Sequence, residues 1–327
     1  SGFKPADEDF RDNVFPMPGK IFLYREVIMK IKDKFKEKNP LVSFEIFPPK
    51  ANYPVDTIYN AIDELYNLEP DFISVTYGAG GSTKDKTVEI SSYMQNKYNL
   101  TSIAHVTCIS STKNEIDNIL NSLKENNVQN VMALRGDYPK DYVPGTLPDD
   151  GYKNSAELIE YFKRNSDLCI GAACYPEKHP DAKDLNFDID FLRRKMNAGA
   201  DFLVTQMFFD NELFYDFYDK SQKKGINLPI ITGIMPILNK RQIDTIINLT
   251  GNSIPKKFRR LLEKYESNPE ALKEAGMSYA VSQIIDLLSW GVDGIHIYTM
   301  NKPSTARKIL GSIAAIRSVL TNECKTS

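Results

Sequence analysis

The sequence predicts an α/β protein built as a single-domain (β/α)8 barrel, or TIM barrel, with extra helices before the eighth strand. Eight apolar runs rich in β-forming residues alternate with stretches of helical period, which indicates right-handed crossovers and a parallel sheet. Eight such units in 327 residues suit a closed barrel, whose usual length is about 250 residues. The G-x-G-x-x-G pattern that favours an open dinucleotide-binding sheet follows none of the runs.

The expected strands are short, mostly apolar runs, as is typical of buried parallel strands. In chain order they are Val42–Phe47, Phe72–Tyr77, Ser102–Cys108, Asn130–Leu134, Leu168–Cys174, Phe202–Phe209, Ile230–Pro236 and Gly294–Thr299.

The expected helices lie between the strands, and several end at Gly or Asn, the residues that favour helix C-caps. They are Val55–Asn67, Asp85–Lys97, Lys113–Glu125, Ser155–Arg164, Asp188–Ala198, Glu212–Lys224, Arg241–Leu249 and Thr305–Leu320.

Two further segments fall outside this alternation. Pro255–Leu288, between the seventh and eighth strands, has the pattern of two extra helices, and Lys20–Lys38 is an amphipathic lead-in. We therefore expect an N-terminal extension with a lead-in helix over residues 1–40, a catalytic barrel over residues 41–322 and a tail over residues 323–327. No linker or shift in composition marks a second domain.

Composition favours a small-molecule partner. A formal net charge of −2 and a pI near 6.0 give no electrostatic reason to expect nucleic acid or an anionic membrane. No apolar run approaches the roughly 20 residues that span a bilayer, and Ser1–Asp12 has no signal-peptide pattern. The four cysteines form no CxxC pair, which suits a reducing compartment. We expect a cytoplasmic protein.

The histidines do not predict a metal site. His105, His179 and His296 are far apart in the sequence and form no HxxxH or HExxH pattern, so we expect no bound metal.

Polar residues at the strand ends mark the expected site, because ligands bind at the carboxyl ends of barrel strands. Glu45 stands between Phe44 and Ile46 and is followed by two prolines. By strand alternation its carboxylate points away from these two neighbours. Partial desolvation there favours the protonated form and suits a general acid. A core-facing carboxylate paired with an arginine is the alternative.

The other strand ends carry further polar groups. The run at Asn130–Leu134 stops abruptly at Arg135 and Asp137, for which a chance ion pair in a solvated loop is the alternative interpretation. The second run ends in the glycine-rich turn Thr76–Thr83, which exposes backbone N–H groups or lets a flat ligand approach. His105, Tyr175, His179 and Gln206 follow or end other strands, and such a set at one mouth predicts a ligand.

Taken in order, these motifs resemble those of the methylenetetrahydrofolate reductase family, FAD-dependent enzymes of one-carbon metabolism. The matching segments are Ser43–Pro49 (SFEIFPP), Thr76–Thr83 (TYGAGGST), His105–Cys108 (HVTC), Leu134–Pro139 (LRGDYP), Tyr175–Ala182 (YPEKHPDA), Ala198–Ala200 with Thr205–Gln206 (AGA and TQ), Gly233–Pro236 (GIMP) and His296–Asn301 (HIYTMN). The resemblance is to the single-domain, bacterial type, because the chain leaves no room for the regulatory domain of the animal enzymes.

The resemblance implies reduction of 5,10-methylenetetrahydrofolate to 5-methyltetrahydrofolate by NADH or NADPH through FAD. One mouth for both substrates implies ping-pong kinetics. By similarity, Glu45 is the general acid that helps to open the methylene bridge. Asp137 stabilises the positive charge that develops on the pterin.

The same resemblance implies two sets of ligand contacts. The positions that match FAD-binding residues are Thr76, His105, Leu134, Arg135, Gly136, Asp137, Tyr175, His179, Ala182, Asp188, Arg194 and Lys195. The positions that match folate-contacting residues are Glu45, Asp137, Gln206, Gln242, Tyr298 and Lys302.

Two departures from the family pattern put individual contacts in doubt. Asn154-Ser155 replaces a Tyr-Ala pair that lines the flavin adenosine, and Lys302 replaces an arginine directed at the folate tail. A lysine supplies charge without the bidentate fork of an arginine.

Other functions remain open on the same barrel. A non-catalytic or partner-dependent flavoprotein subunit would keep the FAD residues, although the presence of both Glu45 and Asp137 argues against it. A Schiff-base aldolase needs a desolvated lysine at a strand interior, where this chain has Gln206. A barrel of the proline dehydrogenase kind would not explain SFEIFPP or TYGAGGST. The choice of NADH or NADPH, and of a homo-oligomer or a partner subunit, also stays open.

Overall fold

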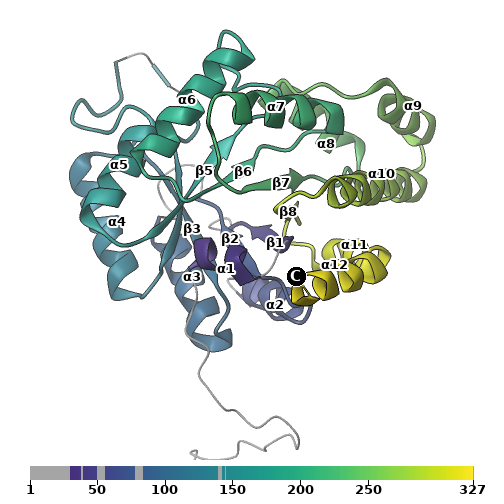
Figure 1. Cartoon of the computed structure of the whole chain (residues 1–327), viewed down its shortest axis with the longest axis horizontal. Helices are drawn as coiled ribbons and strands as arrows, with labels where there is room; N and C mark the ends of the chain where they lie inside the picture. Colours follow the sequence, from purple (N-terminus) through teal and green to yellow (C-terminus); the bar gives the residue numbers. More distant parts are fainter. Residues whose placement is uncertain are drawn as a thin grey trace, which may run out of the picture.

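A closed barrel of eight parallel strands forms the centre of the molecule (Figure 1). The computed structural model describes residues 30–37, 40–49, 56–77, 84–138, 142–143 and 145–326. The strands are β1 (Leu41–Ile46), β2 (Phe72–Val75), β3 (Ser102–Thr107), β4 (Asn130–Leu134), β5 (Cys169–Cys174), β6 (Phe202–Thr205), β7 (Ile230–Ile234) and β8 (Gly294–Tyr298). Each strand pairs with the next, and β1 pairs with β8. The predicted (β/α)8 barrel is confirmed.

Helices surround the barrel as the alternation predicts. They are α1 (Ile31–Glu37), α2 (Asp56–Tyr66), α3 (Lys84–Tyr98), α4 (Lys113–Glu125), α5 (Ser155–Asn165), α6 (Leu185–Ala198), α7 (Asn211–Lys223), α8 (Lys240–Thr250), α9 (Lys256–Tyr265), α10 (Pro269–Trp290), α11 (Pro303–Ser312) and α12 (Ala314–Thr326). Helices α9 and α10 stand between α8 and β8, so the two extra helices before the eighth strand are confirmed.

The strands bury apolar side chains on both faces, although the inner face also carries polar residues such as Ser43 and His296. In β1, Leu41 joins the cluster inside the barrel with Phe72 and Phe202, whereas Val42 and Phe44 join the larger cluster between the barrel and the helices. Because both layers bury apolar side chains, the strands are mostly apolar rather than strictly alternating.

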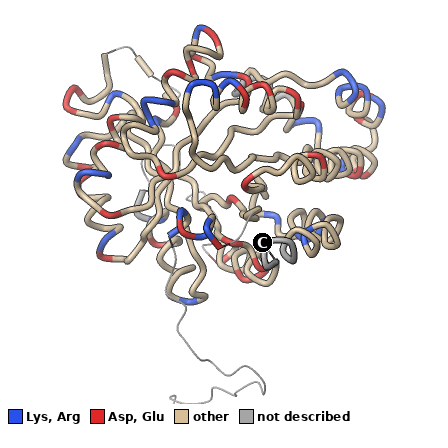
Figure 2. Tube along the Cα trace, in the orientation of Figure 1, with Lys and Arg blue, Asp and Glu red and all other residues tan. Residues whose placement is uncertain are grey.

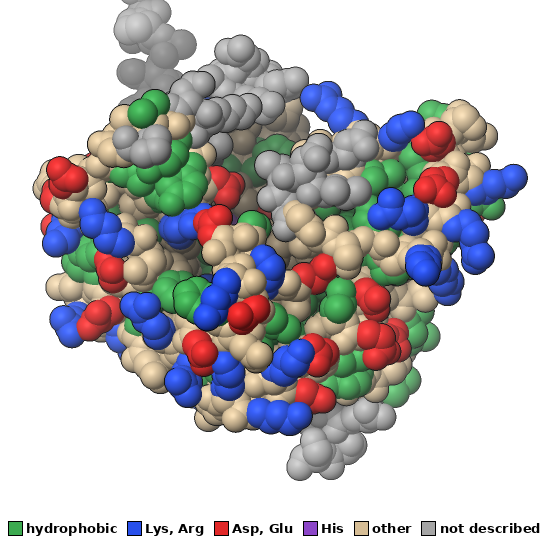
Figure 3. Space-filling view, turned by 90° about the horizontal axis from the view of Figure 1, so that it is seen from above, with side chains coloured by type: hydrophobic (Ala, Val, Ile, Leu, Met, Phe, Trp, Pro, Cys, Tyr) green, Lys and Arg blue, Asp and Glu red, His purple; other side chains and the backbone are tan. Residues whose placement is uncertain are grey.

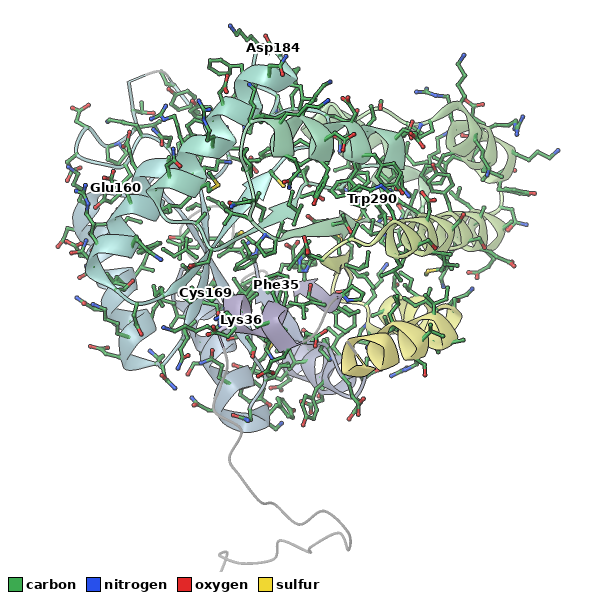
Figure 4. All side chains as sticks on the ribbon, viewed as in Figure 1. Phe35, Lys36, Glu160, Cys169, Asp184 and Trp290 are labelled. Carbon is green, nitrogen blue, oxygen red and sulfur yellow. The ribbon has the colours of Figure 1, made fainter. Side chains whose placement is uncertain are left out.

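Helix α1 covers the amino end of the barrel. Ile31 is fully buried in the interior cluster, and its N–H donates to Asn130 Oδ1 at 2.9 Å. Phe35 packs against Phe202 with 6.2 Å between ring centroids and lies near the buried Cys169 (Figure 4). The lead-in helix is thus confirmed over Ile31–Glu37, while residues 20–29 and 38 lie outside the described residues.

The loops after β3, β4 and β5 lead into capped helices. Thr112 forms a capping box with Glu115 at α4, Asn154 accepts from two backbone N–H groups at α5, and Asp184 caps α6. Each cap contributes about 1 kcal/mol. These caps fix the points at which the chain leaves the mouth of the barrel.

Two sequence predictions are wrong in extent. The sixth strand ends at Thr205 rather than Phe209, and Phe208 and Phe209 are instead buried in the following loop. The final helix is not continuous over Thr305–Leu320, because it breaks at the buried Ile313. The preceding Gly311 and Ser312 are weak helix formers, which lowers the cost of this break.

Charged side chains follow the outer helices and are sparse on the strands (Figure 2). Over the face seen in Figure 3, Lys and Arg are interspersed with Asp and Glu. Among the described helices, none combines the length and apolar character needed to cross a bilayer.

Candidate active site

Glu45 lies at the carboxyl end of β1, on the strand face that points into the barrel. Its neighbours Phe44 and Ile46 are fully buried in the opposite layer, whereas the Glu45 side chain is 21% exposed. The orientation predicted by strand alternation is confirmed. The carboxylate therefore stands at the mouth, partly shielded from water.

Two histidines, rather than an arginine, face this carboxylate. Glu45 Oε2 lies 3.9 Å from His105 Nε2 and 3.8 Å from His296 Nε2. Burial lowers the pKa of His105 to about 4, against the opposing effect of the Glu45 charge. His105 is therefore neutral at pH 7. Among the described residues its Nε2 atom has no hydrogen-bond partner although it is buried.

His296 lies below Glu45 in the barrel interior. It is 1% exposed, its Nδ1 atom is 2.8 Å from Ser43 Oγ, and its Nε2 atom is 3.3 Å from Ser74 Oγ. The pairing of β1 with β8 sets Ser43 opposite His296. The ring is thus held on both nitrogens.

The loop after β8 fixes the backbone around Glu45. Thr299 Oγ1 donates to the Glu45 carbonyl at 2.8 Å. The Asn301 side chain accepts from the Phe47 N–H at 2.9 Å and donates to the Phe47 carbonyl at 2.8 Å. An amide side chain thereby extends the β1 and β8 pairing beyond the strands. Asn301 itself has φ of 54°, a left-handed conformation that Asn tolerates.

Tyr298 crosses the mouth beside Glu45. Its hydroxyl donates to the Thr205 carbonyl at 2.9 Å, and burial, followed by the Glu45 charge, raises its pKa well above the ordinary value. A Cβ atom at Gly233 would lie 2.7 Å from this hydroxyl. The glycine of the GIMP motif is therefore needed for the tyrosine to lie across β7.

Arg135 and Gly136 form the turn that leaves β4. Arg135 Nη1 pairs with Asp181 Oδ2 at 2.6 Å, and the guanidinium lies 5.1 Å from the centroid of the Tyr138 ring. Gly136 has φ of +88°, and a Cβ there would lie 2.8 Å from Thr107 Cβ. Only glycine fits this close backbone approach.

Four further predicted residues gather next to Arg135 at the carboxyl end of β5. The Tyr175 and His179 rings are 4.8 Å apart, and the His179 N–H donates to Asp188 Oδ2 at 2.8 Å. Lys195 Nζ donates to the Ala173 carbonyl at 2.7 Å and lies 5.7 Å from the Tyr175 centroid. Burial lowers the pKa of Lys195.

The two predicted glutamines have their carbonyl oxygens engaged near the mouth. Gln206 Oε1 accepts from the Met207 N–H at 2.9 Å, and Gln242 Oε1 accepts from the Leu238 N–H at 2.7 Å. Each oxygen holds a turn after its strand. The amide groups are thereby oriented, since one end of each is fixed.

Three predicted residues are exposed. Asp137 and Lys302 lie in the loops after β4 and β8. Arg194 is exposed on α6, 5.2 Å from the centroid of its neighbour Phe191. Among the described residues, none of these three side chains forms an ion pair with Glu45. For Asp137 and Lys302, a position after a strand does not by itself bring the side chain to the carboxylate.

The remaining predicted residues line the loops of the same end. Thr76 donates its N–H to the Ile46 carbonyl at 2.9 Å, and Ala182 donates to the His179 carbonyl at 2.9 Å. Leu134 ends β4 and is half-buried. The glycine-rich turn at residues 78–83 lies outside the described residues.

Sequence reasoning missed several residues that build this end of the barrel. Asn154, which departs from the family pattern, has a structural role as the cap of α5. Ser43, His296, Thr299 and Asn301 lie inside quoted motifs, but no role follows from the motifs alone. The available signal was alternation, which places Ser43, Glu45 and Phe47 on one face of β1.

Comparison with known proteins gives the family. The model of the family described as methylenetetrahydrofolate reductase matches residues 30–314. The 5,10-methylenetetrahydrofolate reductase of Salmonella typhimurium is 36% identical over 261 residues, which are 80% of this chain and 86% of that protein. An Arabidopsis thaliana protein named methylenetetrahydrofolate reductase (NADH) 1 is 34% identical over 302 residues, 89% of this chain and 51% of that protein. The chain thus spans about half the length of the plant relative.

A solved structure shares the fold. It is described as an uncharacterized protein from Clostridium thermocellum that binds two copies of 5-methyl-5,6,7,8-tetrahydrofolic acid. It aligns with a TM-score of 0.63 at 16% identity, over 88% of this chain and 99% of its own. With the family match covering every strand of the barrel, the chain belongs to the methylenetetrahydrofolate reductase family.

Proposed function

We propose that this protein reduces 5,10-methylenetetrahydrofolate to 5-methyltetrahydrofolate, with NADH or NADPH as the electron donor and FAD as the cofactor. The observation that carries the proposal is the placement of Glu45, a partly shielded carboxyl at the mouth of the barrel, 21% exposed and without an arginine or lysine partner among the described residues. Membership of the family supports the substrate and the reaction.

Glu45 would act as the general acid. Opening of the methylene bridge requires a proton on the departing amine, and a carboxyl in its acid form can donate it. Burial keeps His105 neutral, so this histidine brings no positive charge that would force ionisation of Glu45. A general acid of this kind contributes about 10²- to 10⁴-fold in rate.

The described residues fit a flavin dinucleotide. The buried His105 Nε2 atom has no protein hydrogen bond within the described residues, and Gly136 lets the chain turn tightly against Thr107 at the end of β4. Arg135 and Lys195 supply positive charge beside the Tyr175 ring, which suits a pyrophosphate.

The cofactor contacts would come mainly from the loops after β4 and β5. Arg135, His179 and Lys195 would hold the phosphates, with Asp188 orienting the His179 backbone. The remaining members of this proposed set are Thr76, His105, Leu134, Gly136, Asp137, Tyr175, Ala182 and Arg194. When bound, FAD supplies hydride transfer between the nicotinamide donor and the folate.

The folate would lie between Glu45 and the loops after β6, β7 and β8. The oriented amides of Gln206 and Gln242 would bind its polar groups, Tyr298 would form a wall of the pocket, and the exposed Lys302 would meet the tail carboxylate. Asp137 would place a negative charge near the cation that forms on the pterin. Because both substrates would use one mouth in turn, we expect ping-pong kinetics.

The absorption spectrum of the purified protein tests the cofactor. We expect flavin bands and release of FAD, rather than FMN, on denaturation. A colourless protein that fails to take up added FAD would contradict the proposal.

The variant Glu45→Gln tests the chemistry. The amide keeps the size of the side chain but cannot donate an acidic proton, so folate reduction should fall about 10²- to 10⁴-fold. NAD(P)H oxidation with menadione as acceptor should remain near the parent rate. Turnover of the folate at the parent rate would show that Glu45 is not the general acid.

A further inference from the structure

The loop after β5 is built from two consecutive turns. The Lys178 N–H closes the first turn on the Tyr175 carbonyl at 3.1 Å, and the Ala182 N–H closes the second on the His179 carbonyl at 2.9 Å. A proline stands at the second position of each turn, where proline is favoured. Lys178 is therefore the residue at which one turn passes into the next.

The backbone of Lys178 is strained at this junction. Its φ is 91°, in a region that glycine tolerates and that lysine rarely adopts. Strain of this kind persists only where the surrounding structure enforces it, and it often marks a functional segment. The side chain of the same lysine supplies contacts that hold this conformation.

The Lys178 ammonium group braces the second turn. Its Nζ atom lies 2.9 Å from the Ala182 carbonyl oxygen and 3.5 Å from those of His179 and Pro180. An ammonium group has three donors and no acceptor, so it can serve three carbonyls at once. Hydrogen bonds from a charged donor are also the stronger kind. The side chain thus folds back over the turn that follows it and holds this turn closed.

The braced turn also fixes the His179 ring. The Asp181 N–H donates to His179 Nδ1 at 3.1 Å, and because a backbone N–H can only donate, this ring nitrogen carries no proton. Burial, followed by the nearby Arg135 charge, lowers the pKa of His179, so the ring is neutral at pH 7. Its single proton then lies on Nε2, which is a hydrogen-bond donor.

We propose that Lys178 is a positioning residue of the cofactor site, which acts by holding the turn that presents the His179 Nε2 proton. An N–H group of this kind selects an acceptor, and the positive charge of the neighbouring Arg135 favours an anionic phosphate oxygen. Asp188 assists, because its carboxylate accepts from the His179 N–H at the start of the turn. The identity of the ligand rests on the proposed function, whereas the brace itself does not.

Three variants separate the brace from the charge and from the backbone strain. Lys178→Met keeps the length of the side chain but removes all three donors. Lys178→Gly removes the donors and also relieves the φ of 91°, so backbone strain does not limit its folding. Lys183→Met is the matched control, because it removes the same charge from an exposed position of the same loop.

The first measurement is the tautomer of His179, read by NMR at pH 7 from flavin-free protein labelled with ¹⁵N-histidine. The His179 signals are identified by their loss in His179→Gln. The parent and Lys183→Met should show an unprotonated Nδ1 and a protonated Nε2. Lys178→Met and Lys178→Gly should show both tautomers, because the Asp181 N–H is no longer held against Nδ1.

The second measurement is the affinity for FAD, from the change in flavin fluorescence when flavin-free protein is added. We expect about tenfold weaker binding in Lys178→Met and in Lys178→Gly, the equivalent of about one hydrogen bond to a charged group. Lys183→Met should remain within about twofold of the parent, because an exposed charge contributes little.

Three results would overturn the inference. A single Nε2 tautomer and the parent affinity for FAD in Lys178→Gly would mean that the ammonium group does not position the ring. An equal loss of affinity in Lys183→Met would mean that only positive charge matters. Mixed tautomers without any loss of affinity would mean that the braced ring does not serve the cofactor.

Failure of the proposed function would look different. A parent protein that binds no FAD would contradict the proposed cofactor, and with it the role of Lys178 in cofactor binding. The tautomers in the flavin-free variants would still decide whether Lys178 positions His179.

Discussion

At the amino end of the barrel, Ile31, Phe72 and Phe202 fill the interior with apolar side chains under helix α1. At the carboxyl end, residues of β1, β3 and β8 place the Glu45 carboxylate within 4 Å of the Nε2 atoms of both His105 and His296. One end is packed with side chains that need no partner, and the other holds groups that are costly to bury.

The difference indicates where stability and chemistry reside. Each well-buried large apolar side chain contributes about 1.5–3 kcal/mol, whereas a buried polar atom without a partner costs about 1–3 kcal/mol. His105 Nε2 is such an atom among the described residues. The amino end therefore offsets the strain of the mouth, as expected where a fold carries a functional site.

The largest effect on stability should come from Phe202→Ala at the amino end. Phe202 is fully buried in the interior cluster, and removal of its ring should lower the free energy of unfolding by about 3–5 kcal/mol. Urea denaturation measures this change. Phe202→Leu, which retains most of the volume, should cost clearly less; equal losses would show that the ring is not packed as described.

The next effect is a pH dependence that arises at the mouth. Burial lowers the pKa of His105 from 6.5 to about 4, so between these values the unfolded chain binds a proton that the folded chain does not. The contribution of His105 to the free energy of unfolding is fully present above pH 6.5. It is lost as the pH falls towards 4, by about 3 kcal/mol in all. Urea titrations at pH 7 and 4.5 should show a smaller loss in His105→Gln than in the parent. Identical losses would contradict this origin.

Replacing a glycine at each end of the barrel by alanine compares how tightly the backbone is packed there. Gly136→Ala combines a φ of +88° with a Cβ 2.8 Å from Thr107 Cβ, whereas Gly225→Ala, in the loop before β7, has a φ of +76° and nothing within 4 Å. We expect a loss of about 1–3 kcal/mol for Gly136→Ala, and a smaller one for Gly225→Ala. Thermal melts give both values, and retention of flavin after gel filtration should fall only in Gly136→Ala. Equal behaviour of the two variants would remove Gly136 from the proposed cofactor site.

The smallest effect should come from an ion pair at the amino end. Lys30 Nζ pairs with Asp167 Oδ2 at 2.8 Å, but the aspartate side chain is 95% exposed. Lys30→Met should therefore change the free energy of unfolding by no more than about 1 kcal/mol. Denaturation at low and high salt checks this, since the difference between parent and variant should shrink as salt is added. A loss as large as that of Phe202→Ala would mean that charge, not apolar packing, holds this end together.

The sequence was sufficient where the decisive signal is local. Alternation placed Glu45 on the inner face of β1, because successive side chains of a strand point to opposite faces of the sheet. The rhythm of apolar runs predicted the barrel and the two helices before β8. Boundaries were less certain: Gly311 and Ser312 weaken the helix before Ile313, but the helical period continues on either side and conceals the break.

Contacts between distant segments could not be read in the same way. Ser43 meets His296 only because β1 and β8 pair in one register, and Arg135 meets Asp181 only because two loops converge. Position after a strand also did not reveal that Asp137 and Lys302 are exposed. Sequence pattern gives the direction of a side chain, but its partner depends on how the sheet closes.

The pairing of Asn301 with Phe47 joins residues 254 positions apart, which has a consequence for the order of synthesis. The first strand leaves the ribosome long before the last, and contacts of such sequence separation form late. Until β8 has been synthesised, Glu45 lacks its contacts with Thr299 and His296 and its neighbour Tyr298. The surroundings of Glu45 are therefore completed only when the first and last strands of the barrel pair.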